Sequence, residues 1–205
     1  MLIMKRLLSF IAMAAILVTF ACTKNNENGN ENGGGGGGKE VSGTDYTKTT
    51  DFALVDLGLS VKWASMNLGA AASWEIGGYY PWGNYSSSGS LGQGGFTNLR
   101  VPTKQEWEEL QAECSRNTYR EEVNGVKGFI FTSKKNGNKI FFPCAGTYST
   151  YTGSYMYVGE RAYYWTATPH ESIEAKAYSS YLSDGIKGVE LHDKVMVNLP
   201  VRLVQ

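Results

Sequence analysis

A run of six glycines, Gly33–Gly38, limits which part of this chain can fold into a compact domain. The surrounding residues 23–50 are rich in asparagine and glycine and contain no large apolar side chain before Val41. Such a stretch buries too little apolar surface to offset the conformational entropy that ordering would cost. We therefore predict a lipid anchor and flexible tether over residues 22–50, and one folded domain over residues 51–205, which is long enough for its own core.

The residues before the tether have the features of a lipoprotein signal peptide. An apolar run, residues 7–20, follows two basic residues and is shorter than the about 20 residues that a membrane-spanning helix requires. Small Ala21 stands directly before Cys22, as a lipoprotein signal peptidase requires. We predict a signal peptide over residues 1–21 and lipidation of Cys22, although an ordinary secretory signal with an incidental cysteine remains an alternative. The residue after Cys22 is not the aspartate that retains lipoproteins at the inner membrane, which favours the outer membrane, facing the periplasm or exposed on the cell surface.

The predicted domain consists mainly of short strand candidates separated by turn residues. Asn136-Gly137 and Asp184-Gly185 predict tight turns, because these residue types tolerate a left-handed backbone. The chain has 19 basic and 19 acidic residues, so it lacks the net positive field typical of nucleic-acid-binding proteins. The strand candidates are residues 54–57, 61–66, 79–82, 126–132, 139–142, 163–168, 175–182, 186–191 and 195–204.

One helix is predicted over residues 104–115. Thr103 and Glu106 have the spacing of a capping box, in which each side chain bonds the backbone N–H of the other residue. This capping role also explains Glu106 without catalysis. The apolar side chains of the predicted inner face recur at helical spacing: Trp107, Leu110 and Cys114.

Seven sequence motifs occur in a fixed order along the domain. They are VDLGLSVKWAS at 55–65, NLGA at 67–70, GYYPWG at 78–83, LRVPTKQEW at 99–107, GNKIFFP at 137–143, YYWTAT at 163–168 and PVRLV at 200–204. Together they resemble the Fibrobacter succinogenes major paralogous domain, a family similar in architecture to C-type lectins and formylglycine-generating enzymes. The resemblance implies an α+β, C-type-lectin-like domain with a mixed antiparallel sheet, one clear helix, long irregular loops and adjacent terminal strands. Two departures from the family pattern are the Thr-Ala pair after Trp165 and the cysteine at 144.

No catalytic or metal-binding motif stands out in the domain. The two histidines, His170 and His192, lie outside any recognisable nucleophile motif, and the calcium-binding strings of C-type lectins do not occur. Cys114 and Cys144 form an even pair in an exported chain, so a disulfide is permitted, whereas two buried free thiols are the alternative. Neither cysteine lies in a segment resembling the copper-binding pair of formylglycine-generating enzymes. We therefore predict no enzyme activity, no cofactor and no metal.

The candidate ligand surface combines a tyrosine-rich loop at 148–157 with the segments 169–174 and 183–194. Flat tyrosine rings suit the apolar faces of sugars. The candidate ligand-binding residues are Tyr148, Tyr151, Tyr155, His170, Glu171, His192 and Asp193. The sequence thus predicts a non-catalytic, lipid-anchored envelope protein whose lectin-like domain binds a glycan or a protein partner. There are two alternatives: a structural or adhesive subunit of a surface assembly, and an enzyme of the formylglycine-generating type.

Overall fold

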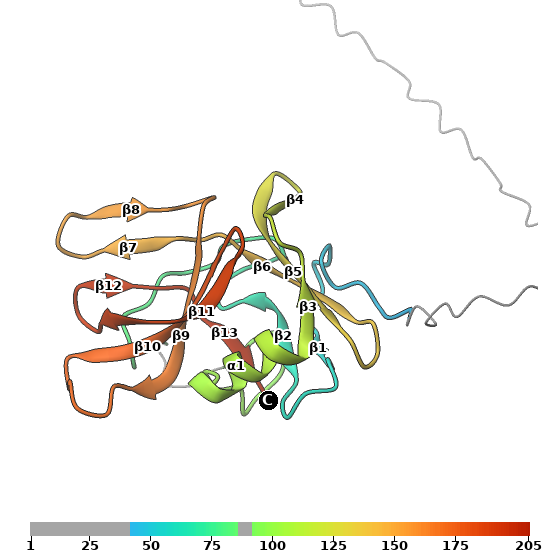
Figure 1. The fold of residues 1–205 in the computed structure, drawn as a ribbon, viewed down its shortest axis with the longest axis horizontal. Coiled ribbons are helices and arrows are strands. Elements are labelled where there is room, and N and C mark those ends of the chain that lie inside the picture. The colour runs from blue at the N-terminus through green and yellow to red at the C-terminus, as the bar shows by residue number, and fades with distance from the viewer. Residues whose placement is uncertain (1–41, 86–91) are drawn as a thin grey trace, which may run out of the picture. The chain divides into compact units, whose positions relative to one another are not determined.

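The computed structural model describes residues 42–85 and 92–205 (Figure 1). The predicted signal peptide, Cys22 and the tether up to residue 41 lie outside the described residues. The described part contains one helix and mostly antiparallel sheets, which confirms the predicted α+β class. Within these residues, no helix is both long and apolar enough to cross a membrane.

Four small sheets make up the domain. The first has the order β1 (Leu54–Val55), β2 (Trp63–Asn67) and β13 (Arg202–Val204), so the two ends of the domain are adjacent as expected. The second pairs β5 (Val126–Ser133) with β3 (Cys114–Arg116), β4 (Glu121–Val123) and β6 (Lys139–Pro143). The third has the order β11 (Ile186–Asp193), β10 (Lys176–Ser183), β9 (Ala162–Pro169), and the fourth β12 (Val197–Asn198), β7 (Thr147–Ser149), β8 (Ser154–Met156).

The folded domain begins earlier than the predicted boundary at residue 51. The backbone N–H of Tyr46 donates to the Lys139 carbonyl at 3.0 Å, and the ring of Tyr46 packs against the main core. Thr47 is buried, and its carbonyl accepts a 2.8 Å hydrogen bond from the Ser73 hydroxyl. The last part of the predicted tether therefore belongs to the domain, because it supplies an aromatic side chain and backbone groups that the domain binds.

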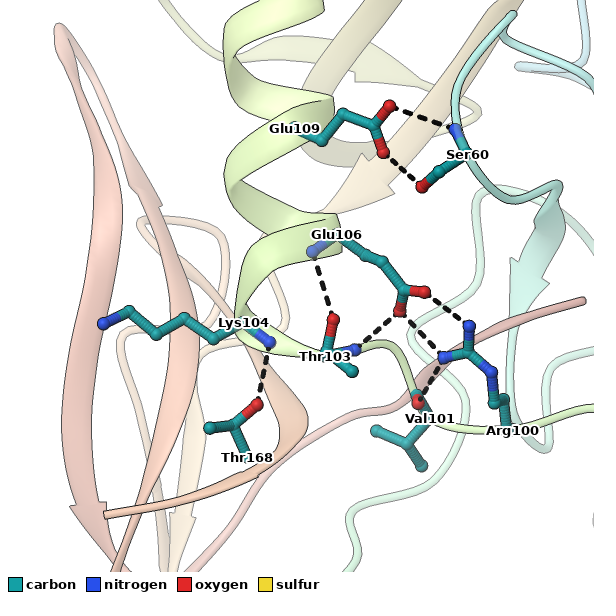
Figure 2. A network of polar contacts seen from close by, with 8 residues as sticks. All are labelled: Ser60, Arg100, Val101, Thr103, Lys104, Glu106, Glu109 and Thr168. Atoms are coloured by element: carbon teal, nitrogen blue, oxygen red, sulfur yellow. Dashed lines mark hydrogen bonds and ion pairs between the residues drawn. The ribbon is translucent and has the colours of Figure 1, made fainter. Parts of the chain in front are cut away.

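The single helix, α1 (Lys104–Glu113), begins with the predicted capping box (Figure 2). Glu106 N–H donates to Thr103 Oγ1 at 3.2 Å, and Glu106 Oε2 accepts from Thr103 N–H at 2.7 Å. The same carboxylate accepts from Arg100 Nη1 at 2.8 Å, and this hydrogen bond lowers the pKa of Glu106. Further along the helix, Glu109 accepts from the backbone N–H of Ser60 at 3.0 Å, which fixes the helix against the segment before β2.

The helix ends two residues before the predicted end at 115. Cys114 has extended backbone angles (φ −100°, ψ 148°), begins β3 and pairs with Ser133 of β5. Cys114 is therefore not on the helix face, contrary to the prediction. Cys114 is nevertheless buried in the same core as Trp107 and Leu110. Its helical spacing from these two residues therefore reflects this shared burial and not a continuation of the helix.

The core is built around aromatic rings from separate elements. The Trp107 ring of α1 lies 4.7 Å from the Trp63 ring, 5.2 Å from Phe142 and 5.4 Å from Tyr164, measured between centroids. All four side chains are fully buried. These contacts join the helix to β2, β6 and β9, so the helix and three sheets share one core.

The hairpin turns follow the Asn-Gly and Asp-Gly pairs only in part. Asp184-Gly185 joins β10 to β11 as predicted, with Gly185 left-handed at φ 73°. At Asn136-Gly137 only Gly137 is left-handed, and the connection from β5 to β6 is longer than two residues. The pair with both residues left-handed is Asn124-Gly125 (φ 48° and 81°), a two-residue turn between β4 and β5 that the sequence analysis did not single out.

Candidate functional site

The tyrosine-rich segment 148–157 forms a β-hairpin over most of its length, where the sequence predicted an irregular loop. Tyr148 of β7 pairs directly with Tyr155 of β8, and their ring centroids are 5.0 Å apart. Tyr79 packs on the other side of Tyr155, also at 5.0 Å, so three rings form a row. Cross-strand packing of this kind stabilises a short hairpin. Tyr151 lies at the hairpin tip and is 84% exposed.

The structure brings parts of the predicted ligand segments together at one end of the domain, at the left in Figure 1, here called the loop end. The start of the segment 183–194, at the β10–β11 turn, lies elsewhere. The backbone N–H of Thr150, at the hairpin tip, donates to the Met196 carbonyl at 3.0 Å. The backbone N–H of Lys194 donates to the Ala175 carbonyl at 2.9 Å. The hairpin tip, the turn after β11 and the loop between β9 and β10 are therefore neighbours.

The polar atoms of the predicted residues at the loop end mostly hold its turns. His170 Nδ1 accepts from the backbone N–H groups of Ser172 and Ile173 at 3.1 and 3.0 Å. One carboxylate oxygen of Asp193 accepts from the N–H groups of Val195 and Met196 at 2.9 and 3.0 Å, and these bonds lower the pKa of Asp193. Glu171 likewise accepts from the Tyr178 hydroxyl at 3.0 Å. The polar atoms of these three side chains thus already have hydrogen-bond partners within the protein.

His192 is inside the structure and not on the ligand surface. Its side chain is 17% exposed and lies edge-on to the rings of Tyr163 (5.2 Å) and Trp165 (6.2 Å). Burial disfavours the charged imidazolium and lowers the pKa of His192 to about 4. The nearest carboxylate, that of Glu190, is 3.9 Å from Nε2.

We expect His192 to be neutral throughout the physiological pH range. Because its pKa in the folded state lies below the ordinary value of 6.5, the unfolded state binds the proton more tightly. The contribution of the buried neutral His192 ring to the stability of the fold is therefore complete above pH 6.5 and is lost as the pH falls towards 4. NMR titration of the imidazole carbon-bound protons should give a midpoint near pH 4, whereas a midpoint above 6 would show that the ring is solvated.

The two domain cysteines do not form the disulfide that the sequence permitted. Both are buried free thiols. Cys114 pairs with Ser133 at one end of β5, whereas the backbone N–H of Cys144 donates to the Lys127 carbonyl near the other end. The strand between these points is about 20 Å long, and a disulfide requires a Cα separation below about 7 Å. Burial raises the pKa of Cys114 to about 11 and that of Cys144 to about 12, so both thiols are protonated at neutral pH.

A cleft of about 910 Å³ lies away from the loop end, and sequence analysis did not identify it. It is bounded by the β4–β5 turn, the segment between β8 and β9, and the β10–β11 turn, which meet near the top centre of Figure 1. This volume is in the range that holds a small ligand. The residues that line it include Ile76, Arg120, Lys127, Val158, Glu160, Arg161, Tyr181, Asp184 and Ile186.

Arg120 fixes two walls of this cleft relative to each other. Its Nη2 lies 2.8 Å from Asp184 Oδ2, and its Nε contacts both oxygens of the same carboxylate at 3.1 and 3.2 Å. Its Nη1 donates to the Gly159 carbonyl at 2.8 Å. The β10–β11 turn and the segment after β8 are thereby held by one guanidinium group, so the cleft has a defined shape before any ligand arrives.

Arg161 forms part of the cleft wall at the end of the hairpin, and the ring of Tyr157, which does not itself line the cleft, packs against it. Tyr157 has a left-handed backbone (φ 61°), which is uncommon for a bulky residue and costs energy. This conformation places its ring 4.2 Å from the Arg161 guanidinium carbon, and Arg161 Nη1 donates to the Tyr163 hydroxyl at 3.3 Å. Backbone strain of this kind concentrates at ligand sites, which makes this wall a candidate binding surface.

The described residues contain no group of three or more His, Cys, Asp or Glu placed to hold a metal ion. Comparison of the chain with protein-family models, curated proteins and solved structures gave no match.

Proposed function

We propose that this chain is a non-catalytic, lipid-anchored envelope protein of the outer membrane, whose C-type-lectin-like domain binds a glycan in the cleft beside Arg120. The ordered series of sequence motifs supports the lectin-like assignment, and the features around Cys22 support the anchor. The separation of the two protonated thiols argues against the copper-dependent chemistry of a formylglycine-generating enzyme.

One observation carries the proposal of a glycan ligand: the cleft combines a fixed Arg120–Asp184 pair with a tyrosine ring. Asp184 accepts hydrogen bonds and Arg120 donates them, which is the pairing that sugar hydroxyl groups need. Tyr181 lines the same cleft, and its ring packs against that of Tyr163 with the centroids 5.2 Å apart, so it presents a supported apolar surface. A sugar ring has polar edges and apolar faces that match both features.

A glycan array with the full-length protein in detergent micelles tests this proposal. We expect binding to at least one glycan, and an affinity lowered at least tenfold by Tyr181→Ala. Tyr151→Ala, at the loop end, is the matched control and should leave the affinity within twofold. Absence of binding at millimolar sugar, or loss of binding in Tyr151→Ala alone, would contradict the cleft as the glycan site.

A structural subunit of a surface assembly is the second candidate, favoured by the exposed edge of β8. Its three residues, Ser154–Met156, are all exposed, and β8 pairs only with β7 among the described strands. Nearby, Val195 and Met196 are 75% and 52% exposed. Such an edge is a template for pairing with another chain. Sedimentation velocity at rising concentration distinguishes the candidates, because only the subunit should assemble.

A further inference from the structure

We infer that the glycan bound in the cleft is acidic and carries the carboxylate of a hexuronic acid, an inference that rests on the proposed function. The cleft contains more cationic than anionic side chains, and two of the cations form no ion pair with any residue that the structure describes.

The charges of the cleft do not cancel. Arg120, Lys127 and Arg161 line it together with only two acidic residues, Glu160 and Asp184. The charges of Arg120 and Asp184 neutralise each other in their ion pair, whereas two of the five Arg120 N–H donors remain for other acceptors. Within the described part of the chain, neither Lys127 nor Arg161 forms an ion pair. Two cations that line the cleft therefore remain available to an anion that enters it.

The Arg161 guanidinium is held in place by two tyrosines, and the nearby Glu190 carboxylate acts on it only beyond ion-pair distance. The Tyr157 ring lies against it at 4.2 Å and the Tyr163 hydroxyl accepts one of its N–H groups at 3.3 Å. A guanidinium has five N–H donors in a planar fork that matches a carboxylate. Only one of these donors has a protein acceptor among the described residues, so Arg161 retains the donors needed for a two-point contact. The strained backbone of Tyr157 is explained if it serves to position this group.

The arrangement suits a sugar acid better than a free anion. Tyr181 offers an apolar face for the sugar ring, while Asp184 and Arg120 can bind its hydroxyl groups. Arg161 and Lys127 then lie on the walls where a ring carboxylate can reach them. A small inorganic anion would bind the two cations but would make no contact that explains Tyr181 or Asp184 in the same cleft.

Paired glycans test the inference directly. Full-length protein in detergent micelles is titrated calorimetrically with polygalacturonate, alginate and chondroitin fragments, and with the carboxyl-reduced form of each. Reduction removes the charge and keeps the sugar backbone. We expect at least one acidic fragment to bind, with at least tenfold weaker binding of its reduced form and a marked loss of affinity in 0.5 M salt.

Charge variants locate the contact. Arg161→Gln and Lys127→Gln should each weaken binding of the acidic fragment at least fivefold. Lys62→Gln removes an exposed lysine that lines no part of the cleft, and it should have no effect. If acidic and reduced fragments bind equally and the charge variants change nothing, the acidic inference is overturned while the glycan proposal stands. If none of the fragments or array glycans binds, both are overturned. Near-ultraviolet circular dichroism of each variant confirms that its tertiary packing is intact.

Discussion

Replacement of Arg202 by alanine is expected to lower the free energy of unfolding by about 3–5 kcal/mol. Arg202 is fully buried and has no carboxylate partner among the described residues. It donates instead to Asn67 Oδ1 at 2.8 Å, to the Ala64 carbonyl at 2.9 Å and to the Phe141 carbonyl at 2.8 Å. Removal of the side chain takes a charged donor away from these three acceptors, and it leaves a cavity beside Phe142, whose ring lies 4.6 Å from the guanidinium carbon.

Urea denaturation at pH 7 measures this effect. Arg100→Ala is the matched control, because Arg100 is 48% exposed and its ion pair with Glu106 is worth at most about 1 kcal/mol. A loss below 1 kcal/mol for Arg202→Ala would show that Arg202 does not join β13 to β2 and β6 as the hydrogen bonds indicate. Burial lowers the pKa of Arg202 to about 10 although the neighbouring Tyr164 acts in the opposite direction, so the side chain is still charged at pH 7.

Replacement of Trp107 by alanine should have an effect of the same size, about 3–5 kcal/mol, because it removes the ring at the centre of the core. The ring contacts Trp63, Phe142 and Tyr164, which come from three different strands. A cavity at this position would loosen the helix from all of them. Thermal and urea unfolding of Trp107→Ala measure the loss.

The phenylalanine variant separates packing from hydrogen bonding. Trp107 Nε1 is buried without a hydrogen-bond partner in the structure, so Trp107→Phe removes an unsatisfied donor as well as part of the ring. We expect it to cost less than half as much as Trp107→Ala. Tyr119→Ala, at a position 71% exposed, should change stability by no more than about 0.5 kcal/mol. Equal losses for the phenylalanine and alanine variants would indicate that the Nε1–H is bonded in solution.

Features encoded within a few residues were predictable from the sequence. The start of α1 follows from Thr103 and Glu106, because a capping box is a local hydrogen-bonding pattern. The hairpin at Asp184-Gly185 follows from the backbone preference of one dipeptide. The end of the helix was not predictable in the same way, since Cys114 leaves the helix to pair with Ser133, which is nineteen residues further along the chain.

The candidate site was only partly predictable because it is assembled from distant segments. Tyr148, Tyr151 and Tyr155 were recognisable as a cluster, although their hairpin pairing was not. The cleft depends on Arg120 contacting Asp184, which lies 64 residues away in the sequence. No local pattern marks Arg120 or Arg161 as site residues. The local signals available were the turn residues Asn124-Gly125 and Asp184-Gly185, at two turns that border the cleft.

The most direct test of a ligand-binding cleft is to map a bound glycan by NMR. Backbone amide shifts are recorded for the full-length protein in micelles as the tightest-binding glycan is added. The proposal predicts the largest changes at Gly125, Gly159, Arg161 and Asp184, with the loop-end amides of Tyr151 and Val195 unchanged. Changes confined to the loop end, or no saturable change at any described residue, would contradict it.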